Sequence, residues 1–210
     1  MYSPFHALLF FGAFFVGVSE ILQLLNQMIF IPLKYEPELA RLKGISSLPG
    51  IALREDRLSF FVVYAGEYIG IILLVAASLL NINFGFVPLP IWAVSIGIVV
   101  IIIGEFFRLW ATYTLGKSFT YFVVTTKGQK LVKKGPYRFI RHPGYLGGLL
   151  IIAGFGIVSQ SVALAILCIV FLSVAYTYRI KVEESALLKR FGKGYVEYSK
   201  RTARIIPYII

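Results

Sequence analysis

Long apolar stretches broken by short polar segments dominate the 210-residue sequence. A helix of about 20 apolar residues crosses the hydrocarbon core of a bilayer. On this basis we predict five membrane-spanning helices, over residues 4–31, 58–80, 87–114, 143–159 and 161–191. The pattern therefore predicts an all-α integral membrane protein that forms one membrane domain over residues 1–210.

Two of the connections between the predicted spans are short and contain no charged residue. Residues 159–161 leave so short a turn that the last two spans should form a helical hairpin, and the connection 81–90 contains Pro88 and Pro90. The first apolar run has neither a basic segment before it nor a small-residue cleavage site. We therefore expect it to be a retained span and not a signal peptide.

Lysine and arginine residues occur in some of the segments outside the predicted spans and are absent from the others. Segments 32–57, 115–142 and 179–210 hold every Lys and Arg except Arg108, whereas residues 1–31, 81–90 and 159–161 hold none. Positive charge marks the cytosolic side of a membrane protein. The N-terminus is therefore predicted outside, and the C-terminus and the three basic segments in the cytosol. The net charge of +11 then reflects topology, and we expect no nucleic-acid partner.

Composition narrows the possible chemistry. Hydrophobic residues make up 58% of the chain, against roughly 45–50% in soluble domains. Cys168 is the only cysteine, which excludes an intrachain disulfide and a cysteine-rich metal site. Because His6 and His142 are predicted on opposite sides of the membrane, we expect no metal site.

Ionisable residues inside the predicted spans need partners or a cavity, because a charge at the bilayer centre costs about 2.5–3.5 kcal/mol. Glu105 and Arg108 lie three residues apart on one helix and could form an ion pair. Arg108 could equally reach the cytosolic interface and bind an anionic group. Glu20 and Glu67 have no obvious partner in the sequence beyond a helix neighbour.

Two polar features are predicted to meet on the cytosolic side. His142, followed by Pro143, should cap the fourth span, where free backbone N–H groups suit a carboxylate or a phosphate. Arg179 and Glu183 lie four residues apart where the fifth span leaves the membrane, and Glu184 follows. We expect one carboxylate to face a ligand and the other to face water. The tight hairpin would bring this pair beside His142.

Simpler roles are open for several of these residues. His142 could be only a capping residue, and the glycines of the fourth span suit close helix packing. After Phe191, two glycines should end the long helix. The polar tail that follows, with Tyr195 and Tyr198, is typical of an interfacial anchor.

The order of the motifs resembles the isoprenylcysteine carboxyl methyltransferase family and its relatives among membrane methyltransferases. The resemblance covers about residues 104–208, whereas residues 1–103 contain no motif that we can identify. The motifs are Gly104-Glu105-x-x-Arg108, Gly116-Lys117-Ser118-Phe119, Leu131-Val132, Gly135-Pro136-Tyr137, Arg141-His142-Pro143-x-Tyr145-x-Gly147, Arg179-x-x-x-Glu183-Glu184-x-x-Leu187, Phe191-Gly192-x-x-Tyr195-x-x-Tyr198 and Pro207.

This resemblance implies a cytosolic helical region that binds S-adenosylmethionine and releases S-adenosylhomocysteine. The acceptor would be a lipid-tailed or prenylated molecule that enters from the bilayer. Arg108 and Arg179 would be catalytic residues that face its carboxylate. The implied cofactor-binding residues are Thr125, Leu131, Val132, Tyr137, His142, Pro143, Tyr145, Gly147, Glu183 and Glu184.

The chemistry of such a transfer agrees with these residue types. An ionised carboxylate is already a nucleophile and needs positioning and desolvation, not a general base. Methylation of a phospholipid amine would instead require a base, for which Glu183 or Glu184 is a candidate. Three other functions are open. The protein could methylate a small thiol, it could be a membrane reductase that uses NADPH, or it could be a non-catalytic scaffold or channel. The last predicts that Arg179 and Glu183 tolerate replacement.

Overall fold

The computed structural model describes residues 12, 16–18, 50–80, 82, 85–116 and 130–206, with residues 50–58 and 60 described by their backbone alone. Its helices are α2 (Gly50–Leu79), α3 (Ile91–Leu115), α4 (Pro143–Ser159), α5 (Val162–Phe191) and α6 (Lys193–Arg201). A 3-10 turn, η2 (Gly135–Arg138), precedes α4. Residues 12 and 16–18 are also helical, and Val16 is buried in the core.

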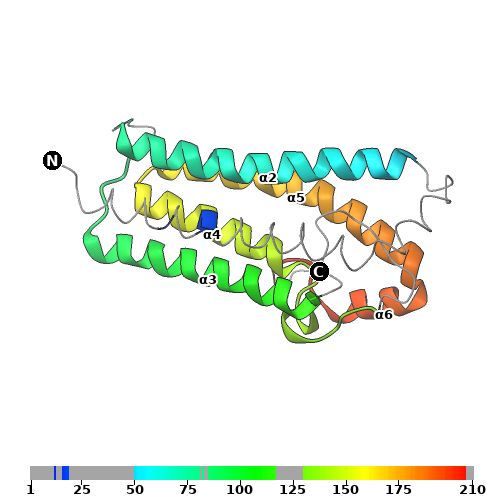
Figure 1. The fold of residues 1–210 in the computed structure, drawn as a ribbon. Helices are drawn as coiled ribbons and strands as arrows, with labels where there is room; N and C mark the ends of the chain where they lie inside the picture. Colours follow the sequence, from blue (N-terminus) through cyan, green and yellow to red (C-terminus); the bar gives the residue numbers. More distant parts are fainter. Residues whose placement is uncertain are drawn as a thin grey trace.

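Helices α2 to α5 form an elongated bundle in which α4 lies between α3 and the α2–α5 pair (Figure 1). The connection before α3 and the turn between α4 and α5 meet at one end of this bundle. There the Val87 amide donates to the Gln160 carbonyl over 2.9 Å, and the Leu89 amide donates to Gln160 Oε1 over 3.0 Å. Helix α6 lies at the opposite end, beside the segment that precedes α4.

Pairs of glycines set the distance between α3 and α4. A Cβ on Gly147 would lie 2.5 Å from the carbonyl oxygen of Gly104, and a Cβ on Gly154 would lie 2.7 Å from that of Gly97. Both distances are too short for a real contact, so the two backbones touch directly. Small residues let helices approach in this way in lipid. Helix α4 therefore packs most closely against α3, and not against its hairpin neighbour α5.

The outer surface of the bundle is apolar along most of its length. Among the residues that the structure describes, three helices are long and apolar enough to cross a membrane, namely α2 over Phe61–Leu79, α3 and α5, whereas α4 is a shorter apolar helix. Large hydrophobic side chains on these helices point outward, among them Phe61, Ile72, Ile96, Ile102, Ile166 and Val170. Helices that are apolar all round belong in a bilayer or in a large core. The chain is thus a multi-pass integral membrane protein.

The helix bounds agree closely with the sequence pattern, with two differences. Helix α2 begins at Gly50, before the predicted apolar span, and the tail predicted as a polar segment forms α6. The predicted first span lies outside the described residues except at 12 and 16–18, as does Glu20. The predicted total of five spans and the orientation of the termini stay predictions.

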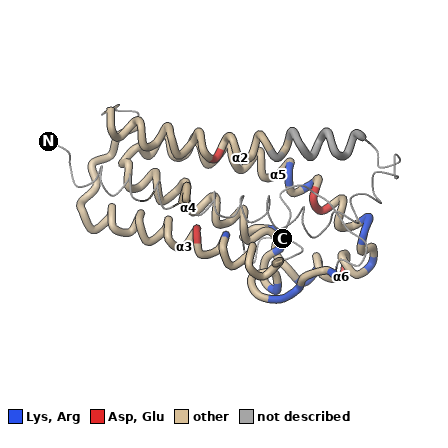
Figure 2. Tube along the Cα trace, in the orientation of Figure 1, with Lys and Arg blue, Asp and Glu red and all other residues tan. Residues whose placement is uncertain are grey.

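Charged residues gather at the end of the bundle where α6 lies (Figure 2). Lys133, Lys134, Arg138, Lys193 and Lys200 are all exposed there. This end carries the predicted functional residues, and the described turns at the opposite end contain no charged residue. The molecule therefore has one polar pole at which a charged ligand can bind.

Candidate active site

His142 is the N-cap residue that precedes α4, and backbone bonds to the C-terminal tail hold it in place. The Arg141 amide donates to the Ala203 carbonyl over 2.8 Å, and the His142 amide donates to the Arg204 carbonyl over 3.1 Å. In return, the Ala203 amide donates to the Phe139 carbonyl over 3.0 Å. Backbone bonds to the tail thus position the motif around His142 from outside its own helix.

The His142 ring lies between two carboxylates. Its Nδ1 is 3.4 Å from Glu183 Oε2, and its Nε2 is 3.4 Å from Glu184 Oε1. The predicted meeting of His142 with the carboxylate pair is therefore confirmed. The expectation that one carboxylate faces water is wrong, because both face the imidazole and their side chains are only 24% and 16% exposed.

The two carboxylates set the charge of His142. Burial lowers the pKa of the imidazole, but the hydrogen bonds and negative charges of Glu183 and Glu184 outweigh that effect and raise the pKa above its ordinary value. The ring is thereby favoured in its protonated form. His142 is therefore suited to hold positive charge between the two carboxylates.

Glu183 also joins two other predicted site residues. The Tyr145 hydroxyl donates to Glu183 Oε1, and Arg179 Nε donates to the same oxygen over 3.1 Å. The Tyr145 ring stacks on His142 with 5.7 Å between ring centroids. Arg179 reaches α2 as well, since its Nη1 donates to Ser59 Oγ over 2.8 Å. The pairing predicted for Arg179 and Glu183 is confirmed.

Arg141 is a site residue that the sequence reading did not single out. Its Nε donates to Glu184 Oε1 over 2.9 Å, and its Nη1 donates to the carbonyl oxygens of Ser199, over 2.7 Å, and of Thr202. Those carbonyls lie at the C-terminal end of α6, where helix backbones lack their own partners. Arg141 therefore joins α6 to the carboxylate pair. In the sequence, Arg141 stands out only as the first residue of the motif Arg141-His142-Pro143.

A second buried cluster lies deeper in the bundle. Arg108 of α3 forms an ion pair with Glu67 of α2, and the Tyr176 hydroxyl of α5 donates to Glu67 Oε2 over 3.2 Å. The Tyr176 ring lies 4.6 Å from the Tyr145 ring, measured between centroids. We predicted that Arg108 would pair with Glu105 or reach the cytosolic interface. The structure instead pairs it with Glu67 on another helix.

The segment before α4 and the helix α6 pack together beside the site. The Tyr198 hydroxyl donates to the Tyr137 carbonyl over 2.7 Å. Burial raises the pKa of Tyr137, and the charge of Glu183 raises it further. Tyr195 and Tyr198 are both buried. The expectation that these two tyrosines anchor the tail at the membrane interface is therefore wrong, since they pack inside the protein.

The remaining predicted cofactor residues differ in their surroundings. Pro143 is the buried first residue of α4, and Leu131 and Val132 are half-buried on the segment that leads to η2. Gly147 packs against the Gly104 carbonyl and the Arg108 side chain, so helix packing accounts for it. Thr125 lies outside the described residues.

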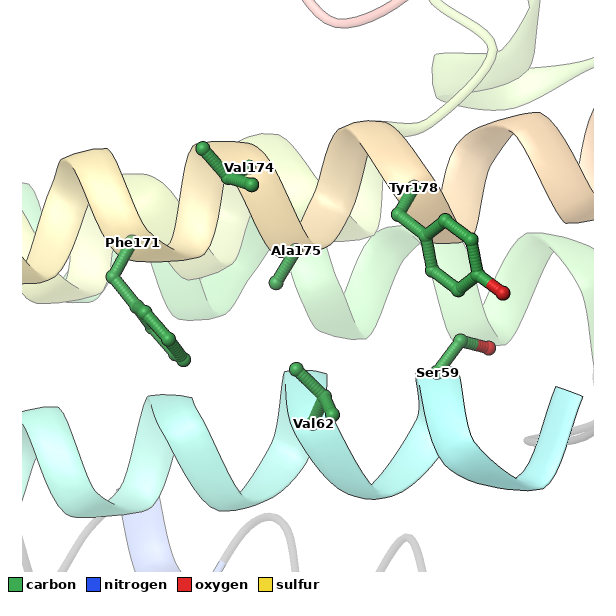
Figure 3. Close-up of a pocket in the computed structure, with 6 residues that line it drawn as sticks. All are labelled: Ser59, Val62, Phe171, Val174, Ala175 and Tyr178. Atoms are coloured by element: carbon green, nitrogen blue, oxygen red, sulfur yellow. The ribbon is translucent and has the colours of Figure 1, made fainter. Parts of the chain in front are cut away.

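An apolar groove runs between α2 and α5 on the outer surface of the bundle (Figure 3). Its volume is about 290 Å³. Ser59 and Tyr178 lie at one end and Phe171 lies at the other. Through Ser59 the groove adjoins the Arg179 guanidinium. The lining residues are Ser59, Val62, Phe171, Val174, Ala175 and Tyr178.

Comparisons with known proteins agree with these motifs. Residues 92–194 match the family described as phospholipid methyltransferase. Protein-S-isoprenylcysteine O-methyltransferase B of Arabidopsis thaliana is 34% identical over 120 residues, which are 56% of this chain and 61% of that protein. The protein-S-isoprenylcysteine O-methyltransferase of Saccharomyces cerevisiae is 34% identical over 116 residues, 54% of this chain and 48% of that one.

A solved structure is also similar. It is described as the eukaryotic intramembrane Ras methyltransferase, isoprenylcysteine carboxyl methyltransferase, and it is 29% identical with a TM-score of 0.48. The match covers 78% of this chain and 53% of that chain. This chain spans less than two thirds of the length of the first relatives that it matches. Over its second half, the predicted resemblance of this chain to the isoprenylcysteine carboxyl methyltransferase family is confirmed.

Proposed function

We propose that this protein transfers a methyl group from S-adenosylmethionine to the carboxylate of an isoprenylcysteine-like lipid. The observation that carries this proposal is the contact of His142 with both Glu183 and Glu184. The cluster contains charges of both signs within hydrogen-bond distance of one another. It adjoins an apolar groove through Arg179 and Ser59.

The chemistry of the site fits the methyl donor. S-adenosylmethionine supplies a sulfonium-bound methyl group, together with a carboxylate, an ammonium group and ribose hydroxyls. His142, at the N-terminus of α4 and with its pKa raised, would suit the carboxylate. Glu183 and Glu184 suit the ammonium and hydroxyl groups. Tyr137 and Tyr145, next to these charges, would form walls of the donor pocket, with Leu131, Val132 and Pro143 nearby in the chain.

The acceptor would approach from the bilayer with its tail in the groove between α2 and α5. Arg179 and Arg108 would then orient the acceptor carboxylate, because a guanidinium binds a carboxylate with two parallel hydrogen bonds. Positioning in a dry site is what this displacement requires. No residue of the chain needs to remove a proton from the acceptor. We place the site on the cytosolic side, because lysines and arginines gather at this end of the bundle (Figure 2).

A phospholipid amine is the second candidate acceptor, and the phospholipid methyltransferase match favours it. That reaction needs a base to accept the ammonium proton. Glu183 and Glu184 are instead engaged by His142, Arg141, Arg179 and Arg204. Such cations stabilise the ionised form of a carboxylate and make it a poor proton acceptor. The structure therefore supports the carboxylate acceptor more strongly.

Transfer of a labelled methyl group to defined acceptors tests the proposal. We expect the purified protein in lipid nanodiscs to methylate an S-farnesylcysteine analogue with a free carboxylate, and to leave the corresponding amide unmethylated. Arg179→Ala should lose turnover by about a hundredfold, because the carboxylate is no longer positioned. Label released from the product as methanol by mild base would identify a methyl ester. Label found only on phosphatidylethanolamine would contradict a carboxyl transfer.

A further inference from the structure

We propose that Glu67 is a positioning residue for methyl transfer, holding Arg108 toward the acceptor through an ion pair that Tyr176 keeps in place. This inference rests on the proposed function, in which Arg108 orients the acceptor carboxylate. Glu67 lies in α2, outside the residues 92–194 that match the family. The N-terminal half of the chain would thus contribute directly to the reaction geometry.

The geometry of Glu67 gives each carboxylate oxygen a separate partner. Oε1 accepts from Arg108 Nη1, and Oε2 accepts from the Tyr176 hydroxyl over 3.2 Å. The Glu67 and Arg108 side chains are only 5% and 11% exposed. Three helices therefore meet at one carboxylate, and rotation of Glu67 would break a bond to α3 or to α5.

Helix α4 makes room for this arrangement. A Cβ on Gly148 would collide with the Tyr176 hydroxyl and would lie 3.4 Å from Glu67 Oε1. The absence of a side chain at Gly148 thus lets the phenol rest against the α4 backbone. From Tyr176 the contacts continue through the Tyr145 ring to Glu183. The Glu67 cluster is in this way connected to the residues proposed to bind the methyl donor.

Stability alone is a weak reason for such a cluster. Removing two charges from water costs free energy that their mutual attraction offsets only when the geometry is good, and apolar residues of similar volume often serve as well. A guanidinium carries five N–H donors. Arg108 can therefore bind Glu67 and an acceptor carboxylate together. Glu67 would then fix the direction of the guanidinium and partly offset its positive charge.

Reducing that charge has a kinetic consequence. An acceptor carboxylate bound too strongly in the ground state loses nucleophilicity, since binding that is not strengthened in the transition state does not accelerate the reaction. In Glu67→Gln the amide keeps the shape of the side chain but loses its charge. We expect the KM for the acceptor to fall. We also expect kcat to fall by about tenfold or more, because the guanidinium is misplaced and binds too strongly.

The test is steady-state methyl transfer to an S-farnesylcysteine analogue by the full chain in nanodiscs. It compares the wild type with Glu67→Gln, Glu67→Asp and Tyr176→Phe. Glu67→Asp keeps the charge and should return KM toward the wild-type value, whereas Tyr176→Phe should reduce kcat less than Glu67→Gln does. Glu197→Gln is the matched control, since Glu197 is exposed on α6. The affinity for S-adenosylhomocysteine should be the same in all five proteins.

The outcomes separate the positioning role from a structural one. A lower acceptor KM together with a lower kcat in Glu67→Gln, a return of KM toward the wild-type value in Glu67→Asp, and an unchanged affinity for S-adenosylhomocysteine support the inference. Unchanged kcat and KM in Glu67→Gln overturn it. A parallel loss of turnover, S-adenosylhomocysteine affinity and melting temperature also overturns it, because that pattern indicates loss of folding. A wild type that methylates no carboxylate overturns the proposed function first, and the role of Glu67 with it.

Discussion

Consecutive residues on a helix point about 100° apart, and this angle explains how one imidazole contacts both Glu183 and Glu184. The two ring nitrogens of His142 lie on different edges of the ring, and each faces a different carboxylate at 3.4 Å. A ring with a single polar edge could not satisfy both carboxylates. The two ring nitrogens of a histidine thus match a pair of adjacent glutamates.

Protonation of His142 should make the stability of the protein depend on pH. The folded pKa is raised by the two carboxylates, so the stabilisation is complete below the unfolded pKa of about 6.5. It is lost as the pH rises through the folded value. We expect the melting temperature in detergent to fall for the wild type relative to His142→Gln between pH 6 and pH 9. A constant difference between the two proteins over that range would show that His142 does not titrate.

An ion pair between residues close in the sequence could be predicted, whereas an ion pair between distant residues could not. Arg179 and Glu183 lie four apart on one helix, and their ion pair follows from helix geometry. Arg108 had a local candidate in Glu105, yet the structure pairs it with Glu67, 41 residues away. No helical periodicity links α2 to α3. Such a pair becomes visible only when the helices are packed.

At the scale of elements, the structure describes a helix over each of the last four predicted apolar runs, and three of these helices are long enough to cross a bilayer. Helix α4 begins at Pro143 and ends at Ser159, as the pattern predicts. Helix α6 was not predicted, because its nine residues lie between glycine-containing and extended segments and are largely polar. The fold of this tail depends on contacts with Arg141 and Tyr137, which are distant in the sequence.

Because α3 and α4 pack so closely, we predict that the stability of the protein depends strongly on the absence of a side chain at Gly147. A Cβ on Gly147 would meet the Gly104 carbonyl oxygen at 2.5 Å, whereas a Cβ on Gly144 would meet nothing within 4 Å. Gly147→Ala should therefore destabilise the protein by about 1–3 kcal/mol through overpacking, and Gly144→Ala should not. Thermal unfolding in detergent measures both variants. Equal melting temperatures would show that the helices are further apart than described.

At the scale of the whole molecule, charge and apolar surface are separated along the bundle axis. The polar pole contains α6 and the His142 cluster, and the opposite end contains the turns around Gln160 (Figures 1 and 2). This division follows from the distribution of lysines and arginines in the sequence. The position of the groove between α2 and α5 could not be predicted, because it depends on which side chains leave a gap between two packed helices.

The orientation of the bundle can be tested by labelling from one side. Lys200→Cys and Phe86→Cys place exposed thiols at the two ends, in a Cys168→Ala background. An impermeant maleimide added to intact cells should label only the thiol at position 86, and inverted membrane vesicles should expose only the thiol at position 200. The reverse pattern would place the candidate site outside the cytosol and contradict the proposed access of the methyl donor.

The most direct measurement is calorimetric titration of the detergent-solubilised protein with S-adenosylhomocysteine. We predict saturable one-to-one binding by the wild type. Binding should be lost in both His142→Ala and Glu183→Ala, since each removes one side of the charge cluster proposed to hold the donor. Glu197→Ala, at an exposed position on α6, should bind as the wild type does. A folded wild type that binds no S-adenosylhomocysteine, or variants that bind it unchanged, would contradict the methyltransferase account.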